Sequence, residues 1–109
     1  MPDNNEFDES LEGDSGTAVA EEVKVTEPKQ FQVLLLNEDY TSMDFVVSVL
    51  ETIFSKSPSE AVRIMMKVHK EGQGLCGVYA RQIAETKIFM VHGRAEAENY
   101  PLRCIMKEI

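Results

Sequence analysis

The spacing of apolar positions changes several times along residues 31–109, and each change marks a new element. An unbroken apolar run at 31–36 is typical of a buried strand. Apolar residues three and four apart indicate amphipathic helices, and two short runs of β-forming residues indicate further strands. The predicted order is β-α-α-β-α-β, at residues 31–36, 42–54, 58–71, 74–79, 81–98 and 102–107.

This order predicts an α+β fold, a two-layer sandwich in which helices lie on one face of a three-stranded antiparallel sheet. The single helix between the second and third strands makes those two strands parallel to each other. All neighbouring strands are then antiparallel only if the first strand is central, which agrees with its apolar run. Cys76 and Cys104 fall on different outer strands, so we expect two buried thiols and no disulfide.

Local signals predict where the helices begin and end. Thr41 is expected to cap the first helix by accepting a hydrogen bond from the N–H of Asp44. Tyr40 and Phe45 then have the spacing of a hydrophobic staple. Gly72 is expected to end the second helix. The predicted inward-facing residues are Val46, Val49, Leu50 and Ile53 on the first helix and Ile83, Ala84, Ile88, Val91 and Ala95 on the third.

The charge of the chain is concentrated at its beginning. Residues 1–30 hold nine acids and two lysines, a net charge of −7, whereas residues 31–109 have a net charge of −1. We therefore predict a disordered acidic N-terminal extension at 1–28 and a folded domain at 29–109. The nearly neutral domain offers no electrostatic surface for nucleic acid. No apolar run is long enough to span a membrane, so we expect a soluble, cytoplasmic protein.

A polar corner follows the first strand and suggests a binding site. If the first two helices pack as a hairpin, an apolar groove ends at this corner, with Asn37, Asp39 and His69 at its mouth. The groove residues would be Met43, Val46, Met65 and Val68. Such a groove suits a bulky apolar group next to a cationic donor, because an ammonium group needs acceptors around it.

Three other interpretations of these residues remain open. The corner could be only a capped strand-to-helix turn, and a lone His69 is commonly structural. A metal site at Glu38, Asp39 and His69 lacks a second nitrogen or sulfur ligand at a recognisable spacing. A catalytic site is weakly supported, because no nucleophile, base and orienting group occur together. We expect no cofactor and no metal.

The same residues resemble a known family. The run Leu36–Val46 is similar to the N-D-D-x-T-x-M-x-F-V signature of ClpS, the bacterial adaptor of the Clp AAA+ protease. The similarity covers about residues 31–109, and several spaced blocks are more specific than one motif. The further blocks are Met65–Gly72, Cys76–Tyr79, Ala84–Lys87 and Pro101–Cys104.

The resemblance implies a non-enzymatic adaptor, expected to be monomeric, that binds N-end-rule substrates and delivers them to a ClpA- or ClpC-type unfoldase. It implies a pocket for an N-terminal Leu, Phe, Tyr or Trp, with Met43 as the gatekeeper against β-branched residues. By position, Asn37, Glu38 and His69 would hold the α-amino group, Asp39 and Thr41 would contact the peptide backbone, Met43, Val46, Met65, Val68 and Leu102 would line the pocket, and Gln82, Glu85 and Lys87 would face the unfoldase.

Three residues depart from the family pattern. Glu38 replaces the commoner aspartate, Ser42 replaces a proline, and Gln82 stands where some relatives have an acid. A rival interpretation is a domain like the C-terminal domain of the ribosomal stalk protein, which has a similar order of elements and recruits translation factors. That rival predicts an acidic folded domain with a lysine-rich helical surface, whereas residues 31–109 are nearly neutral.

Overall fold

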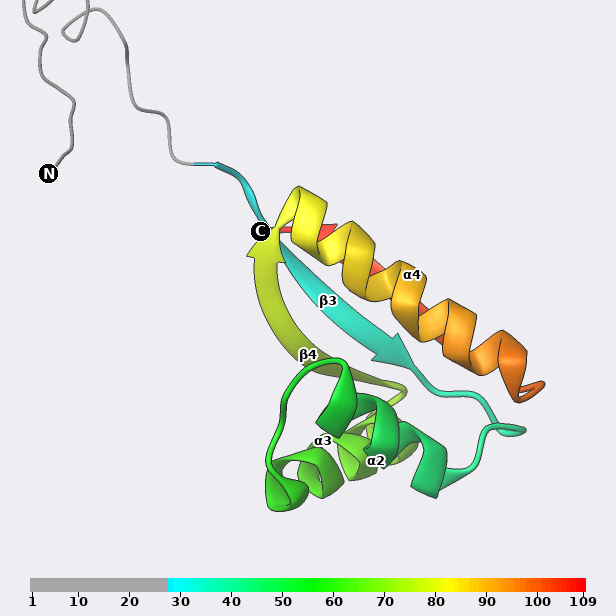
Figure 1. Cartoon of the computed structure of the whole chain (residues 1–109). Coiled ribbons are helices and arrows are strands. Elements are labelled where there is room, and N and C mark those ends of the chain that lie inside the picture. The colour runs from blue at the N-terminus through cyan, green and yellow to red at the C-terminus, as the bar shows by residue number, and fades with distance from the viewer. Residues whose placement is uncertain (1–27) are drawn as a thin grey trace, which may run out of the picture.

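The computed structural model describes residues 28–109, and its element order agrees with the predicted one (Figure 1). The predicted N-terminal extension therefore lies, apart from Pro28, outside the described residues. No helix among residues 28–109 is long and apolar enough to cross a membrane. The elements are β3 (Gln30–Leu36), α2 (Met43–Thr52), α3 (Pro58–Glu71), β4 (Gln73–Ala80), α4 (Arg81–Ala97) and β5 (Arg103–Glu108).

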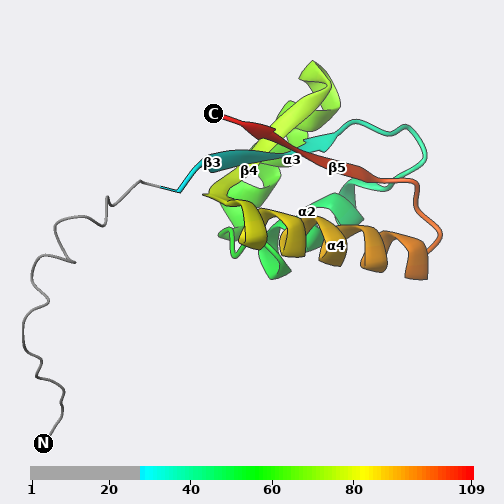
Figure 2. The same cartoon turned by 90° about the horizontal axis from the view of Figure 1, so that it is seen from above.

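The three strands form one antiparallel sheet in the order β4-β3-β5, which confirms the predicted α+β fold and the central position of the first strand. Phe31, Val33 and Leu35 point from β3 into the core and are buried. Figure 2 shows α2 and α4 on the same side of the sheet, and α3 packs along β4. Because side chains alternate along a strand, Gln32, Leu34 and Leu36 of β3 lie on the opposite face of the sheet.

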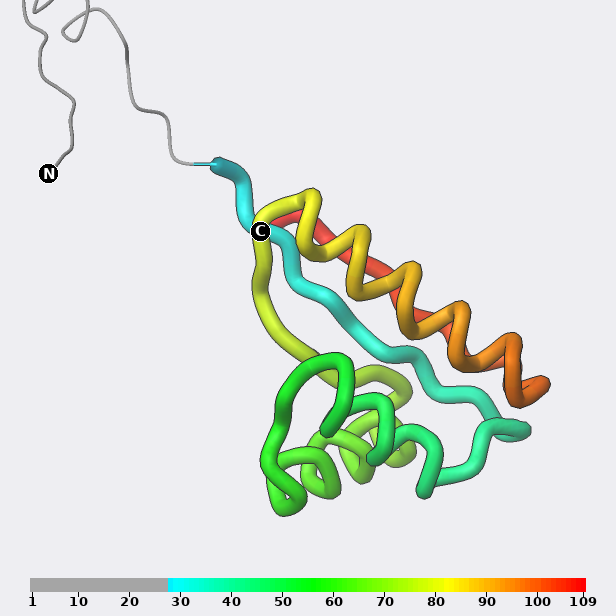
Figure 3. Tube along the Cα trace, in the orientation of Figure 1, coloured from blue at the N-terminus to red at the C-terminus, as the bar shows by residue number. Residues whose placement is uncertain are grey.

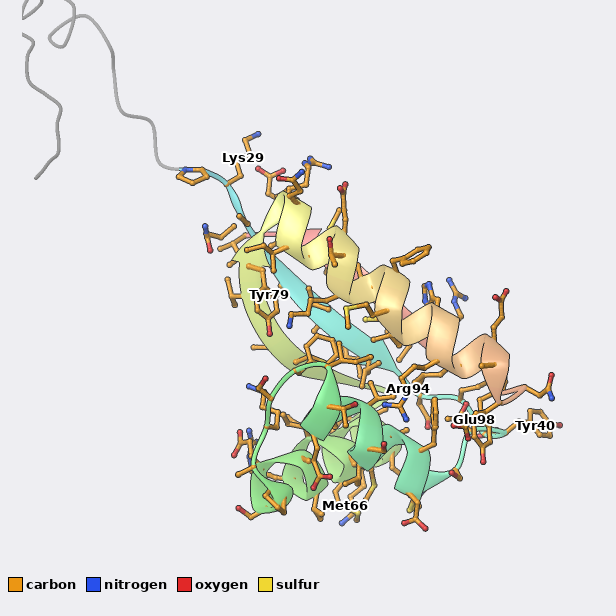
Figure 4. The ribbon with its side chains drawn as sticks, in the orientation of Figure 1. Lys29, Tyr40, Met66, Tyr79, Arg94 and Glu98 are labelled. Atoms are coloured by element: carbon orange, nitrogen blue, oxygen red, sulfur yellow. The ribbon has the colours of Figure 1, made fainter. Side chains whose placement is uncertain are left out.

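Helix α2 begins at Met43, one residue later than predicted, so the Thr41 cap was wrong. Ser42 is the N-cap, and its side chain accepts a hydrogen bond of 3.1 Å from the N–H of Phe45. The staple was also wrong, because Tyr40 is 82% exposed and extends outward in Figure 4. The Phe45 ring instead packs on Tyr100, with ring centroids 4.7 Å apart. Tyr100 is far from Phe45 in the sequence and contacts it only in the folded domain, where it takes the place of the predicted partner Tyr40.

Helix α3 ends as predicted. Gly72 has φ of +94°, a conformation that glycine adopts without the penalty other residues have, and its N–H donates to the carbonyl of Val68. At the other end, Ser57 accepts a hydrogen bond from the N–H of Glu60. This short C-terminal turn sends the chain directly into β4.

Helix α4 differs from its prediction at one inward position. Ile83 is 51% exposed, while Ala84, Val91 and Ala95 are buried. The buried positions are separated by seven and four residues, and Ile83 precedes this row by one residue, about 100° around the helix. Arg94 joins α4 to α2, as Figure 4 shows. Its guanidinium donates hydrogen bonds to Thr52 Oγ1 and Ser48 Oγ, and it also lies over the Phe45 ring.

The first described residues lie beside the C-terminus, as Figure 3 shows. The N–H of Ile109 donates to the carbonyl of Gln30 at 3.0 Å. Cys76 and Cys104 are buried free thiols, which confirms that they form no disulfide. Burial raises the pKa of the Cys104 thiol to about 12 and also raises that of Cys76, because the charged thiolate loses its hydration.

Candidate functional site

One backbone hydrogen bond joins the two segments that carry the predicted polar residues. The N–H of Asn37, directly after β3, donates to the carbonyl of Gly72 at 2.9 Å. This bond holds the loop between β3 and α2 against the end of α3, where His69 lies in the last turn. The N–H of Thr41 donates to the carbonyl of Glu38 at 3.2 Å and closes the loop. Residues far apart in the sequence therefore share one rim.

The loop, the start of α2 and the end of α3 surround a pocket with a volume of about 120 Å³ that opens to solvent. Residue Leu102, from the segment before β5, contributes to the wall. The pocket is lined by Leu36, Asn37, Glu38, Asp39, Thr41, Met43, Val46, Met65, Val68, His69 and Leu102.

The inner part of this pocket is apolar and rigid. Val46, Met65, Val68 and Leu102 are buried. Val46 and Val68 are β-branched residues on helices, so each has a strongly preferred rotamer. Met43 differs, because it is 44% exposed in the first turn of α2 and has a flexible side chain. The wall thus combines fixed residues with one adaptable side chain near the opening.

The rim of the pocket is polar and carries no basic residue except His69. Asn37, Asp39 and His69 are exposed, and Glu38 is half-buried. Two carboxylates and an amide oxygen lie at one opening, and all of them accept hydrogen bonds. They favour a cationic group, because such a group supplies donors and a charge of the opposite sign. The rim therefore complements a positive charge, while the interior complements an apolar group.

Thr41 supplies a further polar atom to this pocket. Among residues 28–109, its buried Oγ1 has no hydrogen-bond partner. A buried hydroxyl without a partner costs free energy, of the order of 1–3 kcal/mol, unless a ligand or water satisfies it. Because Ser42 caps α2 in its place, Thr41 is free to face the pocket. The later helix start and the unpartnered hydroxyl are two results of one local structure.

The structure brings together all ten residues that the sequence suggested for ligand contact, and it adds Leu36. Leu36 is the half-buried last residue of β3, and its place at the end of the apolar run, next to Asn37, was the only sequence signal for it. The three residues suggested to face the unfoldase lie elsewhere. Gln82, Glu85 and Lys87 are in the first turns of α4, which begins next to Ala80, the partner of Gln30 in the sheet.

The pocket and the start of α4 lie at opposite ends of the sheet. The pocket lies where β3 ends, and α4 starts beside the first residue of β3. Six residue steps of about 3.3 Å separate these ends, or about 20 Å along the strand. Within the described part of the chain, no group of three His, Cys, Asp or Glu residues could hold a metal ion.

The fold and this pocket define a small binding domain whose pocket joins an apolar interior to a polar rim. A family model described as "ATP-dependent Clp protease adaptor protein ClpS" matches residues 26–105. The chain therefore belongs to the ClpS family, and it is an adaptor of the Clp protease rather than an enzyme.

Relatives with known names and structures agree with this assignment. The ATP-dependent Clp protease adapter protein ClpS of Oleidesulfovibrio alaskensis is 55% identical over 100 residues, covering 92% of this chain and 94% of that protein. The ClpS of Nitratidesulfovibrio vulgaris (strain Miyazaki F) is 51% identical over 98 residues, covering 90% and 98%. The structure of Agrobacterium tumefaciens ClpS2 bound to L-phenylalaninamide matches with a TM-score of 0.74 and 35% identity, covering 76% of this chain and 100% of that one.

Proposed function

We propose that the chain binds the free α-amino group and the bulky hydrophobic first residue (Leu, Phe, Tyr or Trp) of N-end-rule substrates. We further propose that it delivers them, as a cytoplasmic monomer, to a ClpA- or ClpC-type AAA+ unfoldase. One observation carries the proposal: a single pocket joins an apolar interior to a rim of oxygen and nitrogen acceptors. An N-terminal residue has the same two parts, an ammonium group and a side chain, both attached to its α-carbon.

The rim is assigned to the ammonium group. Its three N–H donors need acceptors, and Asn37, Glu38 and His69 supply an amide oxygen, a carboxylate and an imidazole nitrogen. Hydrogen bonds between a charged donor and such acceptors are stronger than neutral ones. Asp39 and Thr41 are assigned to the peptide backbone, where Thr41 Oγ1 would gain its missing partner. An acetylated chain start has one amide N–H and no charge, so it fits this rim poorly.

The interior is assigned to the first side chain. A closed apolar cavity of about 150 Å³ holds a benzene molecule, and this pocket of about 120 Å³ is open at one side. Its size therefore suits one aromatic or leucine side chain. Agrobacterium tumefaciens ClpS2, 35% identical, has been seen bound to L-phenylalaninamide, a ligand with a free amino group and a benzyl side chain. That ligand supports the same assignment here.

The start of α4 is assigned to the unfoldase. Gln82 and Glu85 are exposed there, at the opposite end of the sheet from the pocket. A substrate and an unfoldase could then be held together without competing for one surface. Lys87 is a less accessible member of this set, because its ammonium group donates to the carbonyl oxygen of Ile53.

The experiment compares two fluorescent peptides that begin with Phe, one with a free amino group and one acetylated. We expect the free peptide to bind the full chain and the acetylated one not to bind. A peptide beginning with free Ala controls for the apolar interior and should bind weakly. Equal binding of the free and acetylated Phe peptides would contradict the proposed role of the rim, and equal binding of the Phe and Ala peptides would contradict that of the interior.

Delivery needs a separate measurement. Glu85→Lys should slow degradation of a Phe-starting substrate by the unfoldase and its peptidase, while peptide binding stays unchanged. Glu98→Lys, an exposed acid at the end of α4, is the matched control. If both variants deliver substrate equally well, the start of α4 does not contact the unfoldase.

A further inference from the structure

Leu102 differs from the other residues that line the pocket, because it lies on neither a helix, a strand nor the loop that carries the polar rim. It belongs to the turn between α4 and β5, two residues after Tyr100 and two residues before Cys104. Figure 2 shows α4 and β5 side by side, with this turn at one end. The position of the buried Leu102 side chain in the pocket wall therefore depends on how the turn is held at each end.

The beginning of the turn is held by Tyr100. Its N–H donates to the carbonyl oxygen of Ala95 at 2.8 Å, and its ring packs on Phe45 of α2. Asn99, directly before it, has φ of +63°, a left-handed conformation that reverses the chain after α4. Pro101, directly after it, has a φ fixed by its ring. The backbone that leads from α4 to the pocket wall is therefore well defined.

The end of the turn is held by His92. Cys104 is buried, and its N–H donates to Nε2 of His92 on α4 at 3.0 Å. This N–H has no partner in the sheet, because β5 is an edge strand. The N–H of Ile109 bonds to Gln30 of β3, and bonded and non-bonded pairs alternate along antiparallel strands. Cys104, five residues earlier, therefore points its N–H away from β3, and His92 supplies the missing acceptor.

Both ends of the turn are thus attached to one face of α4. His92 and Ala95 are three residues apart, so one turn of the helix supplies both acceptors. Because Nε2 of His92 accepts a hydrogen bond, the proton of the neutral ring is on Nδ1. The His92 side chain is exposed and does not line the pocket. Its connection to the pocket runs through the backbone, from Cys104 to Leu102.

We propose that His92 is a positioning residue for the pocket: by holding Cys104, it keeps Leu102 in the wall that contacts the first side chain of the ligand. The inference rests on the proposed function of the pocket and adds a residue outside its lining. Without the acceptor, the turn is free at one end. The rim stays assembled, because it depends on the bond from Asn37 to Gly72. The loss therefore falls on the apolar interior and not on the site for the ammonium group.

The test compares two variants of the full chain. His92→Leu removes the acceptor, whereas the amide oxygen of His92→Gln reaches nearly as far as Nε2 and can accept the same bond. NMR titration measures the affinities for phenylalaninamide and alaninamide. We expect His92→Leu to lower the affinity for phenylalaninamide about threefold to tenfold, as for the loss of one hydrogen bond, and to leave that for alaninamide nearly unchanged. His92→Gln should restore most of the difference.

Ser57→Ala is the matched control for a loss of stability alone. Ser57 caps α3 at the end away from the pocket, and its removal should lower stability by an amount similar to the loss of one hydrogen bond. The ratio of the two affinities should stay as in the parent chain. If His92→Leu also lowers stability without changing this ratio, His92 has only a structural role and the proposal is overturned.

Two signals test the hydrogen bond without any ligand. The amide of Cys104 should be protected from hydrogen exchange in the parent chain and in His92→Gln, and should exchange about tenfold faster or more in His92→Leu. The ¹⁵N spectrum of the His92 ring should show the proton on Nδ1. Rapid exchange of Cys104 in the parent chain, or a proton on Nε2, would overturn the proposal.

The methyl signals of Leu102 separate this inference from the proposed function. They should shift in His92→Leu and keep their positions in His92→Gln and Ser57→Ala. If the parent chain binds neither amide, the proposed function fails, and these methyl signals still decide whether His92 positions Leu102. Unchanged Leu102 signals in His92→Leu would contradict the positioning role even if the parent chain binds phenylalaninamide tightly.

Discussion

The ammonium group of Lys87 on α4 donates a hydrogen bond of 2.7 Å to the carbonyl oxygen of Ile53 at the end of α2. This carbonyl has no partner within its own helix, since the last carbonyls of a helix point away from it. The same ammonium group lies 5.6 Å from the ring centroid of Tyr79 and 6.0 Å from that of Phe54. Lys87 therefore holds three elements together before any partner binds.

Lys87→Met should lower the free energy of unfolding by about 1–3 kcal/mol, because it keeps the apolar stem but leaves the Ile53 carbonyl without its charged donor. Urea unfolding followed by circular dichroism measures the change. Lys70→Met, an exposed lysine near the end of α3, is the control and should cost clearly less. An equal loss in both variants would mean that the Lys87 bond does not contribute. The measurement also shows whether a Lys87 variant that fails in delivery is simply less stable.

His69→Ala should weaken binding of a free Phe-starting peptide by about 1–3 kcal/mol, if the imidazole accepts a hydrogen bond from a charged amino group. Fluorescence anisotropy with the full chain measures the affinity. Lys70→Ala removes the next side chain, which is not part of the pocket lining, and should leave the affinity nearly unchanged. Unchanged affinity in the His69 variant would make this histidine structural.

Met43→Ala should let peptides beginning with Val or Ile bind, because it removes the exposed, adaptable side chain at the pocket opening where a branched Cβ would enter. The measurement is the affinity for a series of first residues. Met90→Ala is a closely matched control, since Met90 on α4 has the same 44% exposure and does not line the pocket. An unchanged order of preference in the Met43 variant would contradict its role as gatekeeper.

Gly74→Ala should destabilise the fold, by about 1–3 kcal/mol. A Cβ at Gly74 would lie 2.7 Å from Val68 Cγ2 and 3.2 Å from the carbonyl oxygen of Ile64, where α3 packs on β4. Gly93→Ala is the opposite case, because Gly93 lies within α4 with no atom near its added Cβ, and alanine there should stabilise by up to about 1 kcal/mol. Thermal unfolding compares the two. A stable Gly74 variant would mean that α3 can move away from β4 at little cost.

The buried thiols make stability depend on pH in alkaline solution. In the unfolded chain a cysteine loses its proton near its ordinary pKa of about 8.5, whereas the folded state holds the proton of Cys104 up to about 12. Between these values the folded state binds more protons, so the free energy of unfolding falls as the pH rises. The expected slope is about 1.4 kcal/mol per pH unit for one thiol.

Cys104→Ala isolates this effect. Its unfolding free energy, measured by urea denaturation from pH 8 to 11, should fall less steeply above pH 9 than that of the parent chain. The slopes matter here and the absolute stabilities do not, because removal of a buried side chain also lowers stability at every pH. Parallel curves over the whole range would show that the folded thiol titrates normally.

The sequence by itself determined the order of the elements, the central place of the first strand and the end of α3 at Gly72. These depend on local rules, such as the period of apolar positions and the freedom of glycine at positive φ. It also located the residues of the candidate pocket, partly through apolar spacing on α2 and α3 and partly through the resemblance to a family.

The tertiary structure decided everything that depends on contacts between distant segments. Ser42 rather than Thr41 became the cap of α2, Phe45 packed on Tyr100 rather than on Tyr40, and Ile83 was left exposed on α4. The hydrogen bond from Asn37 to Gly72, which assembles the rim of the pocket, joins residues that no periodic pattern relates. The physical reason is that neighbouring residues compete on nearly equal terms for a cap or a contact, and the packing of the whole domain selects among them.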